Sequence, residues 1–250
     1  MRIGSLFSGI GGLELGLEWA GVGHTVWQVE REPFCLDVLA KHWPEAKRFT
    51  DVREVGAHNL EPVDVICGGF SCQDISAAGR GAGIVAGTRS GLWYEFRRVV
   101  EETRPQWVVV ENVSALTGAK HRAGLNAVLG GLRSLGYCGE RSVFPAADVG
   151  SPQKRERVFI VAYAERQGRE GSEPHNRVPR GPCQAHPVLR DRTVEPWLAL
   201  DGNRGSLRSP DGFSVAMERR RIHALGNAVV PQVAEVVGRR LLAIHAEVNG

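Results

Sequence analysis

The first 164 residues alternate short β-branched runs with segments of helical periodicity, and this alternation restricts the fold more than any other feature. Strand-like runs are expected at residues 2–7, 24–30, 63–69, 106–113 and 157–164, with helical segments at 12–21, 33–42, 91–103 and 125–136. Strands that alternate with helices are typical of a parallel sheet covered by helices on both faces. We therefore predict an α/β fold with a doubly wound, mostly parallel sheet.

The pattern changes after Ala164. Residues 165–217 combine prolines, glycines and arginines without sustained periodicity, as expected of a small irregular lobe rather than of further sheet. Helical spacing returns at residues 229–248. We therefore expect a main domain over residues 1–164, a lobe over 165–217 and a segment over 218–250 that returns to the main domain.

Composition excludes several classes of protein. Hydrophobic residues make up 42% of the chain, but no apolar run approaches the roughly 20 residues that span a bilayer, so no membrane association is expected. Glycines interrupt the N-terminal stretch and no cleavage signal is visible, so we expect a cytoplasmic rather than a secreted protein. We also expect the protein to be a monomer. The five cysteines form no Cys-x-x-Cys pair, and we predict no metal site.

Positive charge is concentrated in one part of the chain. The net charge of +3 does not by itself indicate a nucleic-acid partner, but residues 165–222 hold 11 arginines and 8 acidic residues. Guanidinium groups bind phosphate in a bidentate way, so this stretch is compatible with phosphate contacts. A solvated basic loop is an equal alternative.

The segment Leu6–Gly12 (LFSGIGG) places three glycines between a strand and a helix. Such a turn lets a ligand approach the backbone closely and directs helix N–H groups at it. Glu30, at the end of the second strand, can accept hydrogen bonds from a ribose, and Asp51 follows the next segment. The motif predicts ligand binding, and tight packing of strand against helix is the alternative.

The segment Gly68–Ser76 (GGFSCQDIS) places Cys72 just after a buried strand. Functional residues of open α/β sheets gather at the carboxyl ends of strands. A thiol there acts as a nucleophile once cations or helix dipoles lower its pKa. Packing as a small apolar group is the alternative, and we prefer that interpretation for Cys67, inside the strand.

Further polar groups are expected at the same sheet edge. The run VVVENV ends with Glu111, where burial would raise the pKa and suit the carboxyl group to proton donation at neutral pH. In the stretch QKRER, Arg155 and Arg157 alternate, so an extended backbone points both to one face. These groups could hold a polar heterocycle or a phosphate. A loop carboxylate and alternating surface charge are the alternatives.

In their chain order, these motifs resemble those of the DNA (cytosine-5)-methyltransferase family. Five stretches carry the likeness: FSGIGG (7–12), GGFSCQDIS (68–76), ENV (111–113), QKRER (153–157) and GNAVVP (226–231). They are similar, in turn, to the family's cofactor loop, nucleophile loop, glutamate motif, arginine motif and closing motif. The resemblance covers about residues 1–163 and 218–245 and implies a Rossmann-like methyltransferase fold. The main domain is then catalytic and cofactor-binding, and the lobe is a target-recognition region.

The resemblance implies methylation of C5 of a cytosine in double-stranded DNA by S-adenosyl-L-methionine, in a restriction-modification or phage self-protection context within a bacterial cell. The cytosine would be flipped out of the duplex. Cys72 would attack C6, Glu111 would hold the N3 edge and share or donate a proton, and Arg157 would hold O2 with Arg155 beside it. By similarity, the cofactor residues are Phe7, Gly9, Ile10, Gly11, Glu30, Asp51, Val52, Leu92, Asn227 and Ala228.

Three features depart from the family's pattern. Ser71 precedes Cys72 where the family usually has proline, which should loosen the turn without changing the reaction. Ser5 stands where the family often has an aspartate, and residues 165–217 form a short region for recognising bases. The alternatives are therefore a catalytically impaired DNA-binding relative, or a methyltransferase that acts on RNA cytosine.

Overall fold

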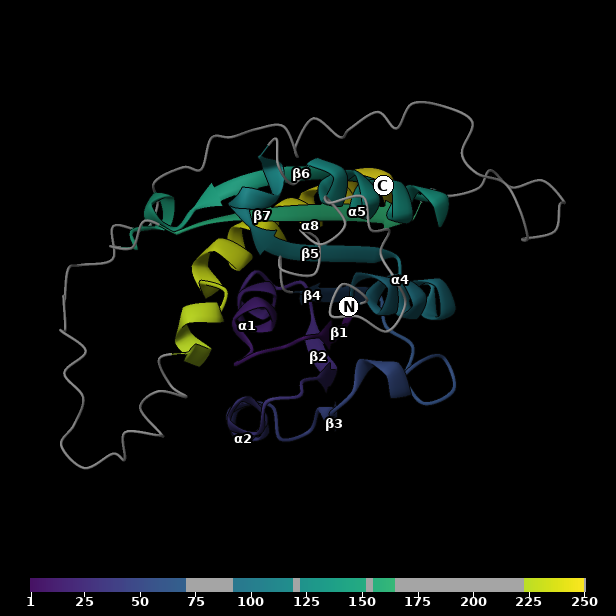
Figure 1. Cartoon of the computed structure of the whole chain (residues 1–250), viewed down its shortest axis with the longest axis vertical. Helices are drawn as coiled ribbons and strands as arrows, with labels where there is room; N and C mark the ends of the chain where they lie inside the picture. Colours follow the sequence, from purple (N-terminus) through teal and green to yellow (C-terminus); the bar gives the residue numbers. More distant parts are fainter. Residues whose placement is uncertain (71–91, 119–121, 152–154, 165–222, 250) are drawn as a thin grey trace, which may run out of the picture.

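The computed structural model describes residues 1–70, 92–118, 122–151, 155–164 and 223–249, and Figure 1 shows their arrangement. A seven-stranded sheet with the order β3-β2-β1-β4-β5-β7-β6 forms the centre. Its strands are β1 Arg2–Leu6, β2 His24–Val29, β3 Lys47–Phe49, β4 Val65–Gly69, β5 Trp107–Val113, β6 Tyr137–Pro145 and β7 Glu156–Ala164. The α-helices are α1 Gly12–Trp19, α2 Pro33–His42, α4 Leu92–Thr103, α5 Arg122–Ser134 and α8 Pro231–Asn249, and the short 3-10 turns are η1 Val52–Glu54, η4 Ser114–Thr117 and η6 Ala146–Val149.

The sheet is doubly wound and mostly parallel, as predicted. Strands β3, β2, β1, β4 and β5 run parallel, whereas β7 is antiparallel to β5 and β6 is antiparallel to β7. The strand order reverses between β1 and β4, because the chain first builds outward to β3 and then returns to the other side of β1. Crossovers that leave in opposite directions open a crevice at the carboxyl ends of these strands, where ligands of such sheets bind.

Two strands were missed by the sequence prediction. Strand β3 is only three residues long and two of them are basic, so it carries no apolar run. Strand β6 lies at the edge of the sheet, and the middle of its sequence, Gly139–Ser142, is small or polar. An edge strand is covered on fewer sides than a central one, so its sequence shows no continuous hydrophobic run.

Helices cover both faces of the sheet, each over its own hydrophobic cluster (Figure 1). On one face, α4 and α5 pack through Trp93, Phe96, Val99, Val100, Leu125, Val128 and Leu132. On the other face, α1 and α8 pack through Leu13, Leu17, Val233, Ala234, Val237, Leu241 and Ile244. Successive residues of a strand serve opposite faces, so in β4 Ile66 joins the first cluster while Val65 and Cys67 join the second.

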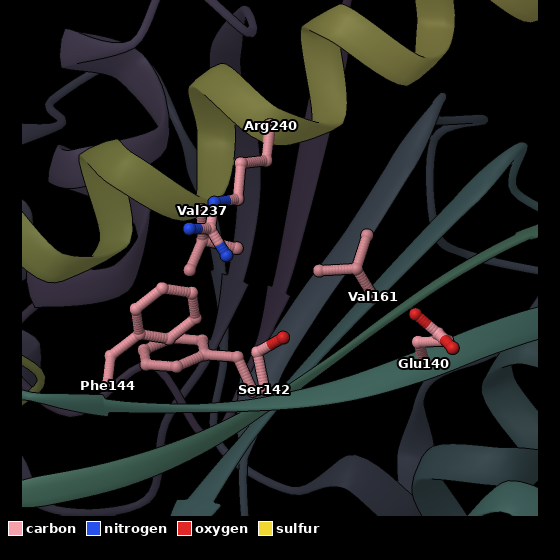
Figure 2. A pocket seen from close by; sticks show the side chains of 7 residues that line it. Glu140, Ser142, Phe144, Val161, Val237 and Arg240 are labelled. Atoms are coloured by element: carbon pink, nitrogen blue, oxygen red, sulfur yellow. The ribbon is translucent and has the colours of Figure 1, made fainter. Parts of the chain in front are cut away.

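Helix α8 extends from α1 across to the antiparallel end of the sheet. A Cβ at Gly16 of α1 would lie 2.2 Å from the Pro231 carbonyl oxygen, so the two helices touch closely where α8 begins. At the other end, the Arg240 guanidinium lies 4.9 Å from the centre of the Phe144 ring of β6, over a small pocket (Figure 2). No helix in the described ranges is long and apolar enough to cross a bilayer.

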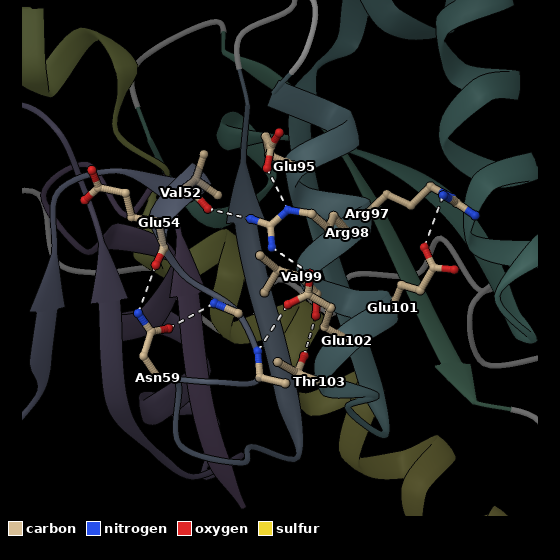
Figure 3. A network of polar contacts seen from close by, with 12 residues as sticks. Val52, Glu54, Asn59, Glu95, Arg97, Arg98, Val99, Glu101, Glu102 and Thr103 are labelled. Carbon is tan, nitrogen blue, oxygen red and sulfur yellow. Dashed lines mark hydrogen bonds and ion pairs between the residues drawn. The ribbon is translucent and has the colours of Figure 1, made fainter. Parts of the chain in front are cut away.

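Helix α4 is tied to the segment after β3 by a polar network centred on Arg98 (Figure 3). The Arg98 guanidinium donates to the Val52 carbonyl, to Glu95 and to Glu102, each at 2.8 Å. Glu102 also accepts a hydrogen bond from the Ala57 backbone N–H at 3.2 Å. Arg98 therefore connects the helix that follows the predicted nucleophile loop with the segment that carries the predicted cofactor residue Val52.

Replacing Arg98 with methionine is expected to lower the free energy of unfolding by about 1–2 kcal/mol, because three charge-assisted hydrogen bonds are lost at a partly exposed site. Urea unfolding of the two proteins measures the difference. Arg97→Met is the matched control, since Arg97 lies one residue away and its contacts with Glu101 and Ser134 are both 3.4 Å long. An equal loss in both variants would contradict the importance of the network.

Candidate functional site

A cleft of about 500 Å³ lies at the carboxyl edge of the parallel strands. Its wall consists of the β1–α1 turn, the residues that follow β2, the ends of β4 and β5, Arg157 of β7, and part of the segment 223–229. Residues far apart in the sequence thus meet at the point where the strand order reverses. This is the position at which open α/β sheets bind their ligands.

The glycine turn between β1 and α1 has the backbone form that its sequence predicts. Gly9 and Gly11 have φ angles of 57° and 83°, in the left-handed region that glycine adopts without strain. Phe7 also has a positive φ of 57°, which costs about 1 kcal/mol or more in a residue with a side chain. A Cβ at Gly12 would lie 2.3 Å from the Val229 carbonyl oxygen, so this glycine lets the segment 223–229 approach the start of α1.

The Glu30 carboxylate is held in place by the backbone. Its Oε2 accepts a hydrogen bond from the Gly9 N–H, and its Oε1 accepts from the N–H groups of Arg31 and Glu32, all at 2.7 Å. A carboxylate offers about four acceptor sites, so three bonds leave capacity for a ligand hydroxyl. Because Glu30 also lines the cleft, it is a fixed acceptor at the mouth of the glycine turn.

The structure brings some of the predicted cofactor residues to the cleft and leaves others outside its lining. Phe7, Gly9, Glu30, Asn227 and Ala228 line the cleft, whereas Ile10, Gly11, Asp51, Val52 and Leu92 do not. Asp51 lies at the same sheet edge as Glu30, since the Glu30 N–H donates to Phe49, the last residue of β3, at 3.0 Å. Hydrogen bonds from Arg53 lower the pKa of Asp51 to about 2.

Glu111 and Arg157 form an ion pair in the lining of the cleft. Arg157 Nε lies 2.8 Å from Glu111 Oε1, and the two side chains are 18% and 10% exposed. The antiparallel register of β5 and β7 sets Arg157 opposite Val113, so Glu111 and Arg157 are diagonal neighbours on one face of the sheet. Burial raises the pKa of Glu111 to about 7, although Arg157 and Arg155 oppose the rise.

Glycine at position 69 makes room for this carboxyl group. Gly69 of β4 is in register with Glu111 of β5, and a Cβ at Gly69 would lie 2.5 Å from Glu111 Oε2. The Glu111 carboxyl group therefore lies over the end of β4. The nucleophile loop predicted from the sequence starts at that strand end.

Arg155 is joined to the segment that closes the cleft. Its Nη1 donates to the Leu225 carbonyl at 3.4 Å, while its Nε and Nη2 are buried without a hydrogen-bond partner among the described residues. Burial lowers the pKa of Arg155, and the nearby charge of Arg157 lowers it further. Arg157 lines the cleft, whereas Arg155 does not belong to its lining.

Cys72 and Ser71 lie outside the described residues, but the chain leading to them is well anchored. Phe70 is buried and its ring centre lies 5.6 Å from that of Trp93 and 6.3 Å from that of Phe96. The Asn112 side chain donates to the Phe70 carbonyl at 2.8 Å. Cys72 therefore follows two residues after a fixed point at the edge of the cleft.

Several functional candidates were not predicted as site residues. The Asn112 amide could have been inferred from its place beside Glu111 at a strand end. Ser5, Ser8 and Glu14 also line the cleft, beneath the glycine turn. The sequence shows no signal for Glu14, because a glutamate in an amphipathic helix is normally exposed.

The two ends of the cleft suit different ligand groups. Glu111 can donate a proton to a ring nitrogen, and the Arg157 guanidinium beside it can donate to a carbonyl oxygen, so this end fits a polar heterocycle. The glycine turn and Glu30 offer backbone approach and an acceptor for hydroxyl groups at the other end. The site can therefore hold a nucleoside-like group and a heterocyclic base side by side.

Comparison with known proteins gives a family match. A family model described as C-5 cytosine-specific DNA methylase matches residues 1–209. Among curated proteins, the Type II methyltransferase M.NgoBI of Neisseria gonorrhoeae is 33% identical over 196 residues, which are 78% of this chain and 60% of that protein. The Type II methyltransferase M2.BsuMI of Bacillus subtilis is 36% identical over 166 residues, 65% of this chain and 42% of that protein.

Solved structures show the same fold. A candidate DNA modification methyltransferase encoded within an E. coli prophage has a TM-score of 0.55 at 28% identity, covering 66% of this chain and 47% of that one. A DNMT2 of Spodoptera frugiperda has a TM-score of 0.54 at 18% identity, covering 72% and 55% of the two chains, a likeness of fold alone. The matched regions span between about a third and three fifths of the length of the curated relatives M2.BsuMI, M2.ScrFI and M.NgoBI.

Proposed function

Because this chain belongs to the C-5 cytosine-specific DNA methylase family, we propose that it transfers the methyl group of S-adenosylmethionine to C5 of cytosine in DNA. The observation that carries the proposal is the buried Glu111–Arg157 pair, 2.8 Å apart, in the same cleft as the glycine turn. The curated relatives are Type II methyltransferases, and on that basis we propose a restriction-modification context in a bacterial cytoplasm. Residues 165–217 are proposed as the target-recognition region.

The residues of the glycine half of the cleft fit S-adenosylmethionine. Glu30 keeps acceptor capacity for ribose hydroxyls while three backbone N–H groups fix its carboxylate. Gly9 has space beside its backbone, with nothing within 4 Å of a Cβ built there, so a ligand can lie against the turn. Phe7, Asn227 and Ala228 complete this half, and we propose Asp51, Val52 and Leu92 as its outer border. When bound, the cofactor supplies an electrophilic methyl group.

The other half of the cleft fits a cytosine that has left the duplex. A base inside a double helix cannot reach a buried side chain, so it must be flipped out. With a pKa near 7, the Glu111 carboxyl group can carry a proton and donate it to N3, while Arg157 donates to the O2 carbonyl oxygen. Both interactions withdraw electrons from the ring. The C6 carbon thereby becomes open to attack by a nucleophile.

Cys72 is proposed as that nucleophile. It follows three residues after Gly69, which is in register with Glu111, so the sequence distance is short enough for the thiol to reach a base held by Glu111. A bond from the Cys72 thiolate sulfur to C6 would place electron density on C5, which then takes the methyl group and leaves S-adenosylhomocysteine. Passage of the C5 proton to solvent, breakage of the Sγ–C6 bond and return of the N3 proton to Glu111 restore the aromatic ring, the thiolate and the acid.

Bisulfite sequencing of DNA from bacteria that express the chain tests this proposal. We expect 5-methylcytosine at a defined short sequence, and none with the Cys72→Ala variant expressed at the same level. Identical DNA from both strains would contradict the proposed activity. Methyl groups found only in cellular RNA would contradict DNA as the substrate and favour the RNA alternative.

A further inference from the structure

A row of buried polar residues crosses the sheet beneath the glycine turn. Ser5 of β1 is in register with Gln28 of β2 on one side and with Cys67 of β4 on the other. In-register neighbours of parallel strands point to the same face, and Cys67 belongs to the hydrophobic cluster under α1 and α8. All three side chains are buried on a face that is otherwise apolar.

Glu14, in the first turn of α1, adds a carboxyl group to this row. It is fully buried, and the pKa of Cys67 is raised by burial and by the charge of Glu14. The Ser8 hydroxyl donates to the Ser5 hydroxyl at 2.9 Å. We name Ser5, Ser8, Glu14, Gln28 and Cys67 the floor cluster, because three of its members, Ser5, Ser8 and Glu14, line the bottom of the cleft.

The floor cluster contains buried hydrogen-bond donors and acceptors that lack a partner among the described residues. The atoms concerned are the two carboxyl oxygens of Glu14 and the oxygen and nitrogen of the Gln28 amide. None of them has a hydrogen-bond partner of normal distance and angle among the described residues. Leaving a buried polar group unpaired costs about 1–3 kcal/mol. A ligand-binding site can contain such unpaired groups in its free form, because the bound ligand supplies the missing hydrogen-bond partner.

The surroundings of Glu14 favour its neutral form. Burial raises the pKa of Glu14 to about 7, partly offset by the Ser5 and Ser8 hydroxyls, and the charge of Glu18 on the same helix raises it further. On α8, which packs against α1, Glu235 is already paired with Arg239 at 2.8 Å. A positive charge that entered the cleft above Glu14 would therefore shift its proton equilibrium strongly.

We propose that Glu14 is the counter-charge for the positive part of the methyl donor, holding a proton in the free protein and releasing it to solvent when the donor binds. This inference rests on the proposed function. The O–H bond of the Glu14 carboxyl group breaks, its proton passes to solvent water, and the carboxylate that remains is paired with the cation, with no other covalent bond changed. S-adenosylmethionine carries a sulfonium and an ammonium group, and the product S-adenosylhomocysteine retains only the ammonium group.

Because donor binding and proton release are thermodynamically linked, the direction in which pH changes the affinity for the donor is fixed. If binding removes a proton from a group with a pKa near 7, the affinity for the donor rises with pH up to about 7 and is level above it. The dissociation constant of S-adenosylmethionine should thus be about tenfold smaller at pH 8 than at pH 6. 5′-Methylthioadenosine, which has neither positive group, should bind equally at both pH values.

Isothermal titration calorimetry of the full chain with S-adenosylmethionine, S-adenosylhomocysteine and 5′-methylthioadenosine at pH 6 and pH 8 tests the proposal. The Glu14→Gln variant should bind S-adenosylmethionine with an affinity that no longer changes with pH. Glu111→Gln is the matched control, because Glu111 is also a buried carboxyl group of the cleft with a pKa near 7, and the variant should keep the tenfold change. A pH effect on S-adenosylmethionine alone assigns Glu14 to the sulfonium, and an equal effect on the product assigns it to the ammonium.

Proton counting keeps the test independent of whether Glu14→Gln folds. Titrations of the wild-type chain in buffers of different ionisation enthalpy should show close to one proton released per donor bound at pH 6, and almost none at pH 8. If no proton were released at either pH, or if the affinity of Glu14→Gln for S-adenosylmethionine still changed tenfold with pH, the counter-charge role of Glu14 would be overturned. Binding of S-adenosylhomocysteine in the same experiments would still support the proposed function. Absence of binding by all three compounds would overturn both.

Discussion

Glu111→Gln is expected to slow methylation by about 10²- to 10⁴-fold while the affinity for S-adenosylmethionine stays within about threefold of the wild type. Glutamine keeps the size of the side chain and can still approach Arg157, but its amide cannot transfer a proton to N3 of the base. The change therefore removes an interaction that matters as the ring becomes electron-rich, rather than one that binds the cofactor. Single-turnover rates and direct titration with cofactor separate the two effects.

The pH profile gives this prediction a second readout. The acid form of Glu111 predominates below a pKa of about 7, so the wild-type rate should have a descending limb above that pH, which Glu111→Gln lacks. Glu156→Gln is the control, since Glu156 is exposed on β7 beside Arg157 and should behave as wild type. Loss of cofactor binding in Glu111→Gln would show that its role has been misplaced.

Glu14→Gln should stabilise the chain at pH 8 by about 3 kcal/mol, in the absence of cofactor. Burial raises the pKa of Glu14 from 4.5 to about 7. A raised pKa means that the folded state holds the proton more tightly than the unfolded state, so the wild type is most stable below pH 4.5 and loses stability as pH rises to about 7. Glutamine imitates the neutral acid at every pH and does not lose this contribution.

Urea unfolding at pH 5, 6, 7 and 8 measures that difference. The advantage of Glu14→Gln should be small at pH 5 and grow until about pH 7. Glu101→Gln serves as the control, because Glu101 is an exposed helical carboxylate whose ion pair with Arg97 is 3.4 Å long. A difference that is the same at all four pH values would show that Glu14 does not titrate in this range.

Most of the fold could be predicted from the sequence because its signals are local. The run that became β5 is continuously β-branched, and the segment that became α4 has apolar residues at helical spacing, so each element shows its own periodicity. Strands β3 and β6 were missed because a three-residue strand and a polar edge strand have no such signal. Each is recognised by its pairing with another strand, β3 with β2 and β6 with β7, and this pairing leaves no local pattern in the sequence.

The chemistry of the site was partly predictable for the same reason. Glu30 and Glu111 stand at strand ends, and the carboxyl ends of parallel strands meet at one edge, so their shared location follows from the fold class. The floor cluster was not predictable in this way. Gln28 lies in a strand and Glu14 in a helix with ordinary sequence patterns, and only the register of β2 against β1 places Gln28 beside Ser5.

The sequence alone determined the helices and the strands other than β3 and β6, the glycine turn and the kinds of side chain at the strand ends, because periodicity and turn residues act over a few positions. The tertiary structure decided which of these groups meet. The antiparallel register of β7 on β5 joins Glu111 to Arg157, and the approach of Val229 to Gly12 closes the cleft. It also decided the protonation of Glu14 and Glu111, because a pKa depends on burial and on charges that packing brings together from separate parts of the chain.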